Sequence, residues 1–336
     1  MGKKVLITGA AGFVGYHLAT RLLSETKDIQ VTLVDNFFRS TNDHELSVLR
    51  EDPRVSFIEA DLADPAFFAS FPGGFEHVYH LAAVNGTQLF YEIPHEVLRL
   101  NVLSLTNLLE WFRQRNVDGK LCFTSSNEAY AGGLNAYGKL PIPTPEAVPL
   151  VIEDPYNPRW SYGASKLIGE LFVIHYAEQH NFRAVIVRPH NFYGPRAGAH
   201  HVIPEFSMRI ARQIDPFSIF GHEETRSFCY IDDAVRAMVE LMVSTATDKH
   251  PVETVHIGTD EETTIGALAD KLFSIASWRP KEIVREPRRP GSVLRRLPHT
   301  GKIKELIGWE PQITLNDGLA RTYEWYAMTG LERYRK

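Results

Sequence analysis

A tyrosine and a lysine stand four residues apart in the segment SYGASK, as Tyr162 and Lys166. If this segment is helical, both side chains lie on one face of the helix. A lysine ammonium, helped by the positive ring of an oxidised nicotinamide cofactor, favours the phenolate of a neighbouring tyrosine and lowers the pKa of that tyrosine. Such a tyrosine can take a proton from an alcohol while hydride leaves the same carbon. The same spacing also occurs on helices without this role, so the motif needs support from elsewhere.

A carboxylate, Glu128, follows the apolar stretch 120–124 in the segment SSNEAYAGG. An acid at such a place serves either as a general base or only as a hydrogen-bond partner and loop cap, and the residues leave both readings open. Its neighbour Asn127 is an amide, which has no proton to give at a usable pKa. A two-carboxyl mechanism that needs an acid beside the base is therefore weakened.

Three glycines, Gly9, Gly12 and Gly15, lie in TGAAGFVG between an apolar stretch and a helical pattern. Glycine there lets the main chain turn tightly and approach a pyrophosphate, which the N-terminus of the following helix binds. Asp35 ends the next predicted strand, twenty residues after the last glycine. A carboxylate binds both ribose hydroxyls but repels a 2′-phosphate, so the pattern favours NAD over NADP. Arg39 weakens this preference slightly.

Alternating strand and helix patterns must position these residues. Short β-branched runs predict strands at 4–9, 31–35, 55–60, 77–83, 120–125 and 184–189. Apolar residues at three- and four-residue spacing predict helices at 12–25, 96–116, 162–179 and 203–213. We therefore expect an α/β fold, a Rossmann-type doubly wound parallel sheet with a smaller C-terminal α/β substrate domain. The expected domains are 1–190, with some later segments crossing back, and 191–336.

Composition excludes several classes of protein. The chain has 336 residues, 44% hydrophobic and 23% charged, which is ordinary for a soluble globular protein. A net charge of -5 argues against nucleic-acid binding, and no stretch is long and apolar enough for a membrane span. The start of the chain lacks a signal-peptide pattern, so we expect a cytoplasmic protein. Two cysteines in apolar surroundings predict buried thiols, and the histidines lack ligand spacing, so we expect no metal.

Taken together, these motifs resemble the extended short-chain dehydrogenase/reductase family, specifically its NAD-dependent nucleotide-sugar epimerases and dehydratases, over nearly the whole chain. The matching segments are TGAAGFVG, HLAA, SYGASK and RPHNFYGPR. The resemblance assigns a third catalytic residue, Ser126, four positions before Tyr130. It implies a set of NAD-binding residues: Gly9, Gly12, Phe13, Val14, Gly15, Asp35, Asn36, Asp61, Leu62, Leu81, Ala82, Ala83, Tyr162, Lys166 and Pro189.

The same resemblance implies that 1–190 binds NAD and that 191–336 binds a nucleotide-diphosphate sugar. The implied substrate-binding residues are Asn85, Asn127, Asn191, His201, Val202, Phe220, Arg226, Arg289 and Arg296. For Arg289 and Arg296 a solvated basic loop is the competing interpretation. Relatives pair two helices into a four-helix bundle, so we expect a homodimer built from 97–114 and 162–178. The proline-rich stretch 132–159 departs from the family in length, and we expect it to be non-helical and to run over the rim of the site.

The triplet that begins at Ser126 separates reaction types in this family, and here it reads Ser, Asn, Glu. Related 4,6-dehydratases have an Asp-Glu pair after the hydroxyl residue, and Asn127 replaces that acid. We therefore expect an epimerase that inverts C4 through a transient 4-keto sugar, with Ser126, Glu128, Tyr162 and Lys166 as its catalytic residues. A nucleotide-sugar 4,6-dehydratase, a nucleotide-uronic acid decarboxylase and a non-catalytic NAD-binding scaffold stay open as alternatives.

Overall fold

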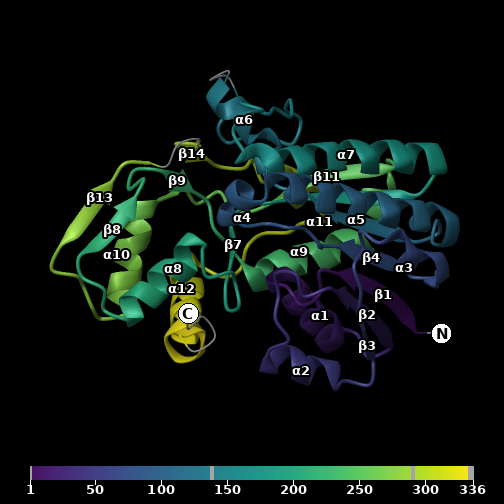
Figure 1. The fold of residues 1–336 in the computed structure, drawn as a ribbon, viewed down its shortest axis with the longest axis horizontal. Coiled ribbons are helices and arrows are strands. Elements are labelled where there is room, and N and C mark those ends of the chain that lie inside the picture. Colours follow the sequence, from purple (N-terminus) through teal and green to yellow (C-terminus); the bar gives the residue numbers. More distant parts are fainter. Residues whose placement is uncertain (1, 137–139, 289–291, 332–336) are drawn as a thin grey trace.

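A twisted parallel sheet forms the centre of the larger half of the molecule (Figure 1). The computed structural model describes residues 2–136, 140–288 and 292–331. Within them, seven strands lie in the order β11-β6-β5-β4-β1-β2-β3, and every neighbouring pair is parallel. These strands are β1 (Lys3–Thr8), β2 (Ile29–Asp35), β3 (Val55–Glu59), β4 (His77–His80), β5 (Lys120–Thr124), β6 (Arg183–Pro189) and β11 (Val252–Ile257). The strand order reverses at β1, and ligands bind at such a switch point in doubly wound folds. The predicted fold is confirmed.

Helices cover both faces of the sheet, because its buried strands are apolar on each side. Val5 and Ile7 face one core with Leu18, whereas Leu6 faces the other with Phe112. The described helices are α1 (Phe13–Glu25), α2 (His44–Arg50), α3 (Pro65–Ser70), α4 (Thr87–Glu92), α5 (Pro94–Arg115), α6 (Glu128–Ala136), α7 (Trp160–His180), α8 (Val202–Ala211), α9 (Ile231–Val243), α10 (Ile265–Ile275), α11 (Gly301–Ile307) and α12 (Leu315–Trp325), with the short turns η1 (Thr245–Asp248) and η2 (Tyr326–Gly330). Helices α5 and α7 lie side by side (Figure 1).

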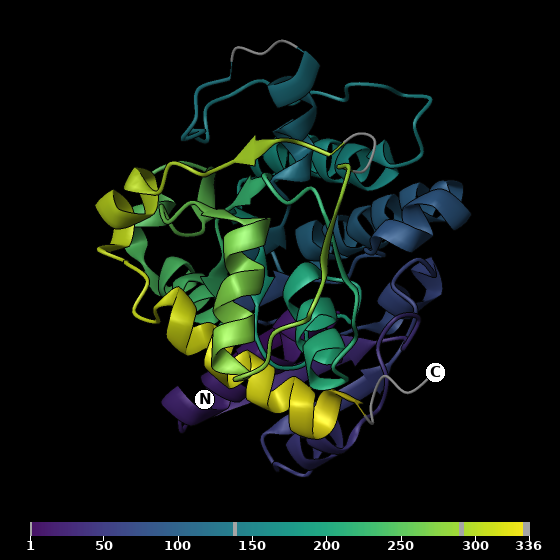
Figure 2. The same ribbon diagram turned by 90° about the vertical axis from the view of Figure 1, so that its left-hand side faces the viewer.

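Short strands and helices of the C-terminal half build a smaller region beside the sheet. Its strands are β7 (Phe192–Tyr193), β8 (Phe217–Phe220), β9 (Thr225–Arg226), β10 (Cys229–Tyr230), β12 (Thr263–Thr264), β13 (Ile283–Glu286) and β14 (Arg295–Arg296). They pair as β10-β7, β12-β9-β14 and β13-β8. Figure 2 shows this region facing the viewer, with its green and yellow helices in front of the sheet and the teal segment around α6 standing above it. The chain therefore places loops of both halves around the carboxyl ends of the central strands.

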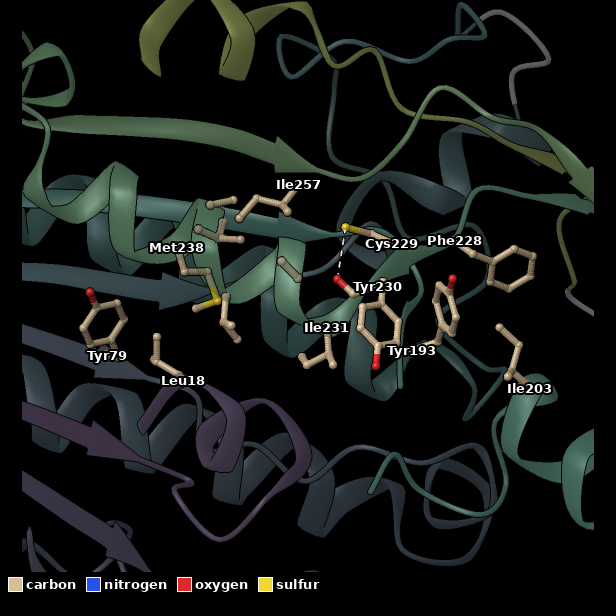
Figure 3. Close-up of a cluster of buried hydrophobic side chains, with 14 of the residues drawn as sticks. Leu18, Tyr79, Tyr193, Ile203, Phe228, Cys229, Tyr230, Ile231, Met238 and Ile257 are labelled. Carbon is tan, nitrogen blue, oxygen red and sulfur yellow. Dashed lines mark hydrogen bonds between the residues drawn. The ribbon is translucent and has the colours of Figure 1, made fainter. Parts of the chain in front are cut away.

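One apolar core continues from the sheet into the smaller region (Figure 3). Leu18 and Tyr79 contribute to it from the sheet side, and Tyr193 and Phe228 from the other side. Cys229 lies in this core and Cys122 in the sheet, and both are free, buried thiols. Because the two regions share buried side chains, they are held in a fixed relation to each other.

The prediction that 132–159 contains no helix is wrong at its start, because α6 extends to Ala136. The prolines of this stretch begin only at Pro141, so residues 132–136 contain no proline that would exclude a helix. Beyond it, the chain is anchored across the site: Thr144 donates its N–H to the carbonyl of Leu297 at 2.9 Å and accepts from the N–H of His299 at 2.8 Å. Further along, the carboxylate of Glu146 accepts from the N–H of His256 at 3.0 Å.

None of the helices described combines the length and the apolar character needed to cross a membrane. In the same part of the chain, no three His, Cys, Asp or Glu side chains gather as a metal site would require.

Candidate active site

The turn between β1 and α1 leaves no room for side chains. Gly9 has φ +69°, and a Cβ atom on it would lie 2.6 Å from the backbone nitrogen of Ala82. A Cβ atom on Gly15 would lie 2.5 Å from the carbonyl oxygen of Gly9. Gly12 is the N-cap residue of α1, whose first backbone N–H groups have no helical partners. This glycine cradle therefore fits the pyrophosphate of a dinucleotide.

Asp35, the last residue of β2, is fixed beside this cradle. Its Oδ2 atom accepts a hydrogen bond from the N–H of Ala11 at 3.0 Å. Its Oδ1 atom accepts from the N–H of Phe37 at 2.9 Å and from the hydroxyl of Ser40 at 2.8 Å. The carboxylate is thus held at the sheet edge where the adenosine ribose lies in dinucleotide-binding folds.

The other predicted cofactor residues also surround the carboxyl ends of the strands. Phe13 and Val14 begin α1, Asn36 follows β2, Asp61 and Leu62 follow β3, Leu81, Ala82 and Ala83 follow β4, and Pro189 ends β6. Parallel strands bring these segments to one edge, although more than a hundred residues of sequence lie between them. The arrangement fits NAD, and the role of each single residue stays a prediction.

Tyr162 and Lys166 lie on α7, one turn apart as predicted. The Lys166 ammonium donates to the carbonyl oxygen of Thr124 at 2.7 Å and lies 5.0 Å from the centre of the Phe123 ring. Burial lowers the pKa of Lys166 to about 7, although the nearby Glu170 carboxylate acts in the opposite direction. This lysine is therefore only partly charged at neutral pH.

Ser126 joins Tyr162 at the end of β5. The two hydroxyls are hydrogen-bonded, and the Ser126 Oγ atom also accepts from the N–H of Glu128 at 3.1 Å. Burial raises the pKa of Tyr162, and Glu128 raises it further, whereas the bond to Ser126 and the charge of Arg39 lower it. The lowered pKa expected from the sequence depends on the positive charge of bound NAD as well as on Lys166, so it stays a prediction for the complex with the cofactor.

Sequence reasoning missed two buried polar groups that hold this machinery in place. Asn101 on α5 accepts from the N–H of Val84 at 2.6 Å and donates to the Ser165 hydroxyl at 3.0 Å, so it ties the loop after β4 to α7. On the next turns of α7, Glu170 accepts from Arg188 at 2.8 and 2.7 Å. A polar residue on the apolar face of a predicted helix is the signal that could have revealed both.

Glu128 is the first residue of α6 and is bound by two arginines. Arg296 donates from Nη1 to the Glu128 carboxylate at 2.8 Å and to the Asn127 side-chain oxygen at 3.0 Å. Arg159, which the sequence did not single out although it lies three residues before Tyr162, approaches the same carboxylate at 3.5 Å. Burial acts to raise the pKa of Glu128, but the charges of Arg296 and Arg159 outweigh it and lower the pKa. Glu128 is consequently an ionised, paired carboxylate.

The predicted substrate residues have different surroundings. Arg226 donates to the carbonyl of Val293 at 2.8 Å and to Glu224 at 2.9 Å, so several of its donors hold neighbouring chain segments. Burial and the charge of Arg296 lower the pKa of Arg226 to about 10. Asn191 donates to the carbonyl of Ser227 at 2.7 Å. Asn85 is partly exposed after β4, His201 and Val202 begin α8, Phe220 is 46% exposed, and Arg289 lies outside the described residues.

Comparison with known proteins agrees with this geometry. The model of the NAD dependent epimerase/dehydratase family matches residues 5–258. A putative UDP-glucose 4-epimerase from Methanocaldococcus jannaschii is 30% identical over 325 residues, which cover 96% of this chain and 97% of that protein. UDP-glucuronic acid decarboxylase 6 from Arabidopsis thaliana is 29% identical over 326 residues, which cover 94% and 86%. The crystal structure of a dTDP-glucose 4,6-dehydratase from Streptomyces venezuelae with NAD bound is 25% identical, covers 97% of each chain and has a TM-score of 0.84. The chain belongs to the NAD-dependent epimerase/dehydratase family.

Proposed function

We propose that the protein is an NAD-dependent nucleotide-sugar epimerase that inverts the configuration at C4 through a transient 4-keto sugar. The observation that carries this proposal is the hydrogen-bonded pair of Ser126 and Tyr162, with Lys166 one turn along α7, beside a carboxylate, Glu128, that two arginines already bind. Inversion at C4 needs a group that takes the hydroxyl proton, but it needs no base for the C–H bond at C5. Tyr162 can take the hydroxyl proton, and the neighbouring carboxylate of Glu128 is already paired with Arg159 and Arg296.

In this mechanism Tyr162 takes the proton of the C4 hydroxyl, and Ser126 orients that hydroxyl through its bond to Tyr162. The residues around the strand ends would hold NAD, which would supply a hydride acceptor for C4 and a positive charge beside the tyrosine. That charge opposes the effect of burial on Tyr162 and favours the phenolate. Lys166, fixed on the Thr124 carbonyl, exchanges its proton near neutral pH because its pKa is about 7. After the keto sugar rotates in the cleft, the hydride would return to the other face of C4, and Tyr162 would give its proton back to the C4 oxygen.

Elimination of water fits the site less well. A 4,6-dehydratase needs a base at C5 and an acid for the departing C6 hydroxyl. The arginines lower the pKa of Glu128 and so weaken it as a base. Asn127 stands at the position of the acid, and its side-chain oxygen accepts a hydrogen bond from Arg296. A non-catalytic scaffold is disfavoured as well, because it would have no need of the buried proton relay.

Decarboxylation of a nucleotide uronic acid is the second candidate. It is favoured by the 29% identity to a UDP-glucuronic acid decarboxylase over nearly the whole chain. It shares the 4-keto stage with epimerisation, because a ketone at C4 makes the neighbouring carboxylate easy to lose. Tyr162, Ser126 and Lys166 would act in the same way up to that stage.

We extend the proposal to the ligands and the assembly. The residues around the strand ends would hold NAD, and those after residue 190 would hold the nucleotide-diphosphate sugar. Helices α5 and α7 pack against each other, and Ile168 and Leu171 on α7 are 37% and 47% exposed, which suits a helix that pairs with a second copy. The homodimer, the division at residue 190 and the cytoplasmic location stay predictions.

A panel of nucleotide sugars incubated with the protein in D2O tests the proposed reaction. We expect a product of unchanged mass with no solvent deuterium on the ring, since hydride travels to the cofactor and back. Loss of water with deuterium in the product would instead identify a dehydratase, and loss of carbon dioxide a decarboxylase.

The Glu128→Gln variant adds a second test of the same reaction. Glutamine keeps an oxygen that accepts from Arg296, so epimerisation should retain at least about a tenth of the wild-type rate, for about one lost charged hydrogen bond. A reaction in which Glu128 is the base should slow by about two to four orders of magnitude.

A further inference from the structure

The cluster around Glu128 contains more positive than negative charge. Among the described residues, Arg226 is paired with Glu224 at 2.9 Å. Arg159 and Arg296 share the single carboxylate of Glu128, at 3.5 and 2.8 Å. The Arg296 side chain is 6% exposed and that of Arg159 is 16% exposed, so the surplus charge is largely removed from water. Because an unpaired buried charge is unfavourable, the cluster would gain from one further anion.

The guanidinium of Arg296 has a buried edge, unpartnered within the described ranges, whose two donors match the geometry of a carboxylate. Its Nη1 atom is used by Asn127 and Glu128. Its Nε and Nη2 atoms are buried and have no hydrogen-bond partner in the described part of the chain. Elsewhere in the protein, Nε and Nη2 of Arg188 make two parallel bonds to the Glu170 carboxylate, at 2.8 and 2.7 Å. The same edge of Arg296 is therefore suited to a second, bidentate carboxylate.

The backbone on the C-terminal side of Arg296 is held rigidly, so its guanidinium has a defined place. Leu297, the next residue, accepts from the N–H of Thr144 at 2.9 Å, and His299 donates to the carbonyl of Thr144 at 2.8 Å. Thr144 is itself fully buried. A guanidinium whose position is set before binding loses less conformational entropy when an anion arrives.

This cluster lies next to the hydroxyls that would act on C4. The N–H of Glu128 donates to Ser126 Oγ at 3.1 Å, and Ser126 is hydrogen-bonded to Tyr162. In a pyranose ring C5, with its C6 substituent, is bonded directly to C4, whereas the diphosphate on C1 stands across the ring. On the basis of the proposed function, we infer that the sugar is a hexuronic acid whose C6 carboxylate pairs with the Nε–Nη2 edge of Arg296, while Arg159 balances Glu128.

Calorimetric titration of the NAD-loaded Tyr162→Phe protein, in which turnover is stopped, tests this inference. The ligands are UDP, UDP-glucose and UDP-glucuronic acid. Because all three contain uridine, any preference for the nucleobase cancels in the ratio of the affinities for the two nucleotide sugars. We expect UDP-glucuronic acid to bind at least about tenfold more tightly than UDP-glucose, because bidentate charged pairs are among the strong hydrogen bonds. Equal or tighter binding of UDP-glucose would overturn the inference but leave the epimerase proposal intact.

Two arginine variants identify the group responsible. Arg296→Met should reduce the ratio to about one while UDP binds as before, whereas Arg295→Met should preserve the ratio. Arg295 is the matched control, since it is the adjacent, exposed arginine and pairs with Glu262 at 2.8 Å. A parallel loss of UDP affinity in Arg296→Met would assign this arginine to the diphosphate and overturn the inference. If Arg296→Met does not fold, the ratio of the two sugar affinities in the Tyr162→Phe protein that keeps Arg296 decides alone. Failure of all three ligands to bind, together with failure of the wild type to convert any nucleotide sugar of the panel, would overturn the proposed function too.

Discussion

Replacing Lys166 with methionine should make the folded protein more stable while it abolishes turnover. The lysine is 4% exposed, and burial lowers its pKa from 10.5 to about 7. The fall in pKa from 10.5 to about 7 corresponds to about 5 kcal/mol at ~1.4 kcal/mol per pH unit. Burial of the charged lysine lowers the free energy of unfolding by this amount at pH 7 and below. Methionine removes that cost and fits between apolar neighbours such as the Phe123 ring.

The gain is reduced by the loss of one hydrogen bond. The carbonyl of Thr124 would no longer receive the Lys166 donor, which lies 2.7 Å away, and an unpaired buried carbonyl costs about 1–3 kcal/mol. We therefore expect Lys166→Met to raise the free energy of unfolding by about 2–4 kcal/mol at pH 7. Between pH 7 and 10.5 the unfolded lysine binds a proton that the folded one does not, so the wild type gains stability with rising pH. The advantage of the variant should accordingly fall by about 1.4 kcal/mol per pH unit above pH 7 and reach zero at about pH 8–10, where the remaining cost of burial equals that of the lost hydrogen bond.

Urea unfolding of the cofactor-free protein at pH 7 and pH 10 measures this effect. Lys120→Met is the matched control, because Lys120 is also buried but has its own partners: it pairs with Asp248 at 2.7 Å and donates to the Ser244 carbonyl at 3.0 Å. That variant should lose about 1–3 kcal/mol. A Lys166→Met protein that is less stable than wild type at pH 7, or whose advantage does not shrink at high pH, would refute the reasoning.

Three further predictions concern the site and the assembly. Tyr162→Phe should slow turnover by about two to four orders of magnitude while NAD stays bound, and near-wild-type rates would exclude the tyrosine as the base. Protein purified without added cofactor should release NAD and not NADP when denatured, because the Asp35 carboxylate repels a 2′-phosphate; a majority of NADP would show that this reading of Asp35 is wrong. Light scattering should give the mass of a dimer for the wild type and of a monomer for Leu171→Glu, and a monomeric wild type would contradict the proposed role of α7.

Long-range contacts decided features that no local pattern indicated. Arg296 is 168 residues from Glu128, and only the folding of the C-terminal segment over α6 brings them to 2.8 Å. This contact turned a candidate base into an ion-paired carboxylate. The pKa of Tyr162 is a second case, since burial by elements that are distant in sequence raises it when no cofactor is bound. Asn101 is a third, because its partners Val84 and Ser165 come from two other elements.

The sequence by itself determined six of the seven described strands of the central sheet, the glycine cradle and the common face of Tyr162 and Lys166, but it did not reveal β11. These features depend on interactions within a few residues: the period of apolar side chains, the backbone freedom of glycine and the pitch of one helix. Only the tertiary structure decided the charge state of Glu128 and the burial of the Nε–Nη2 edge of Arg296. Both depend on the distance between charges and on their removal from water, which are set when segments far apart in the chain pack together.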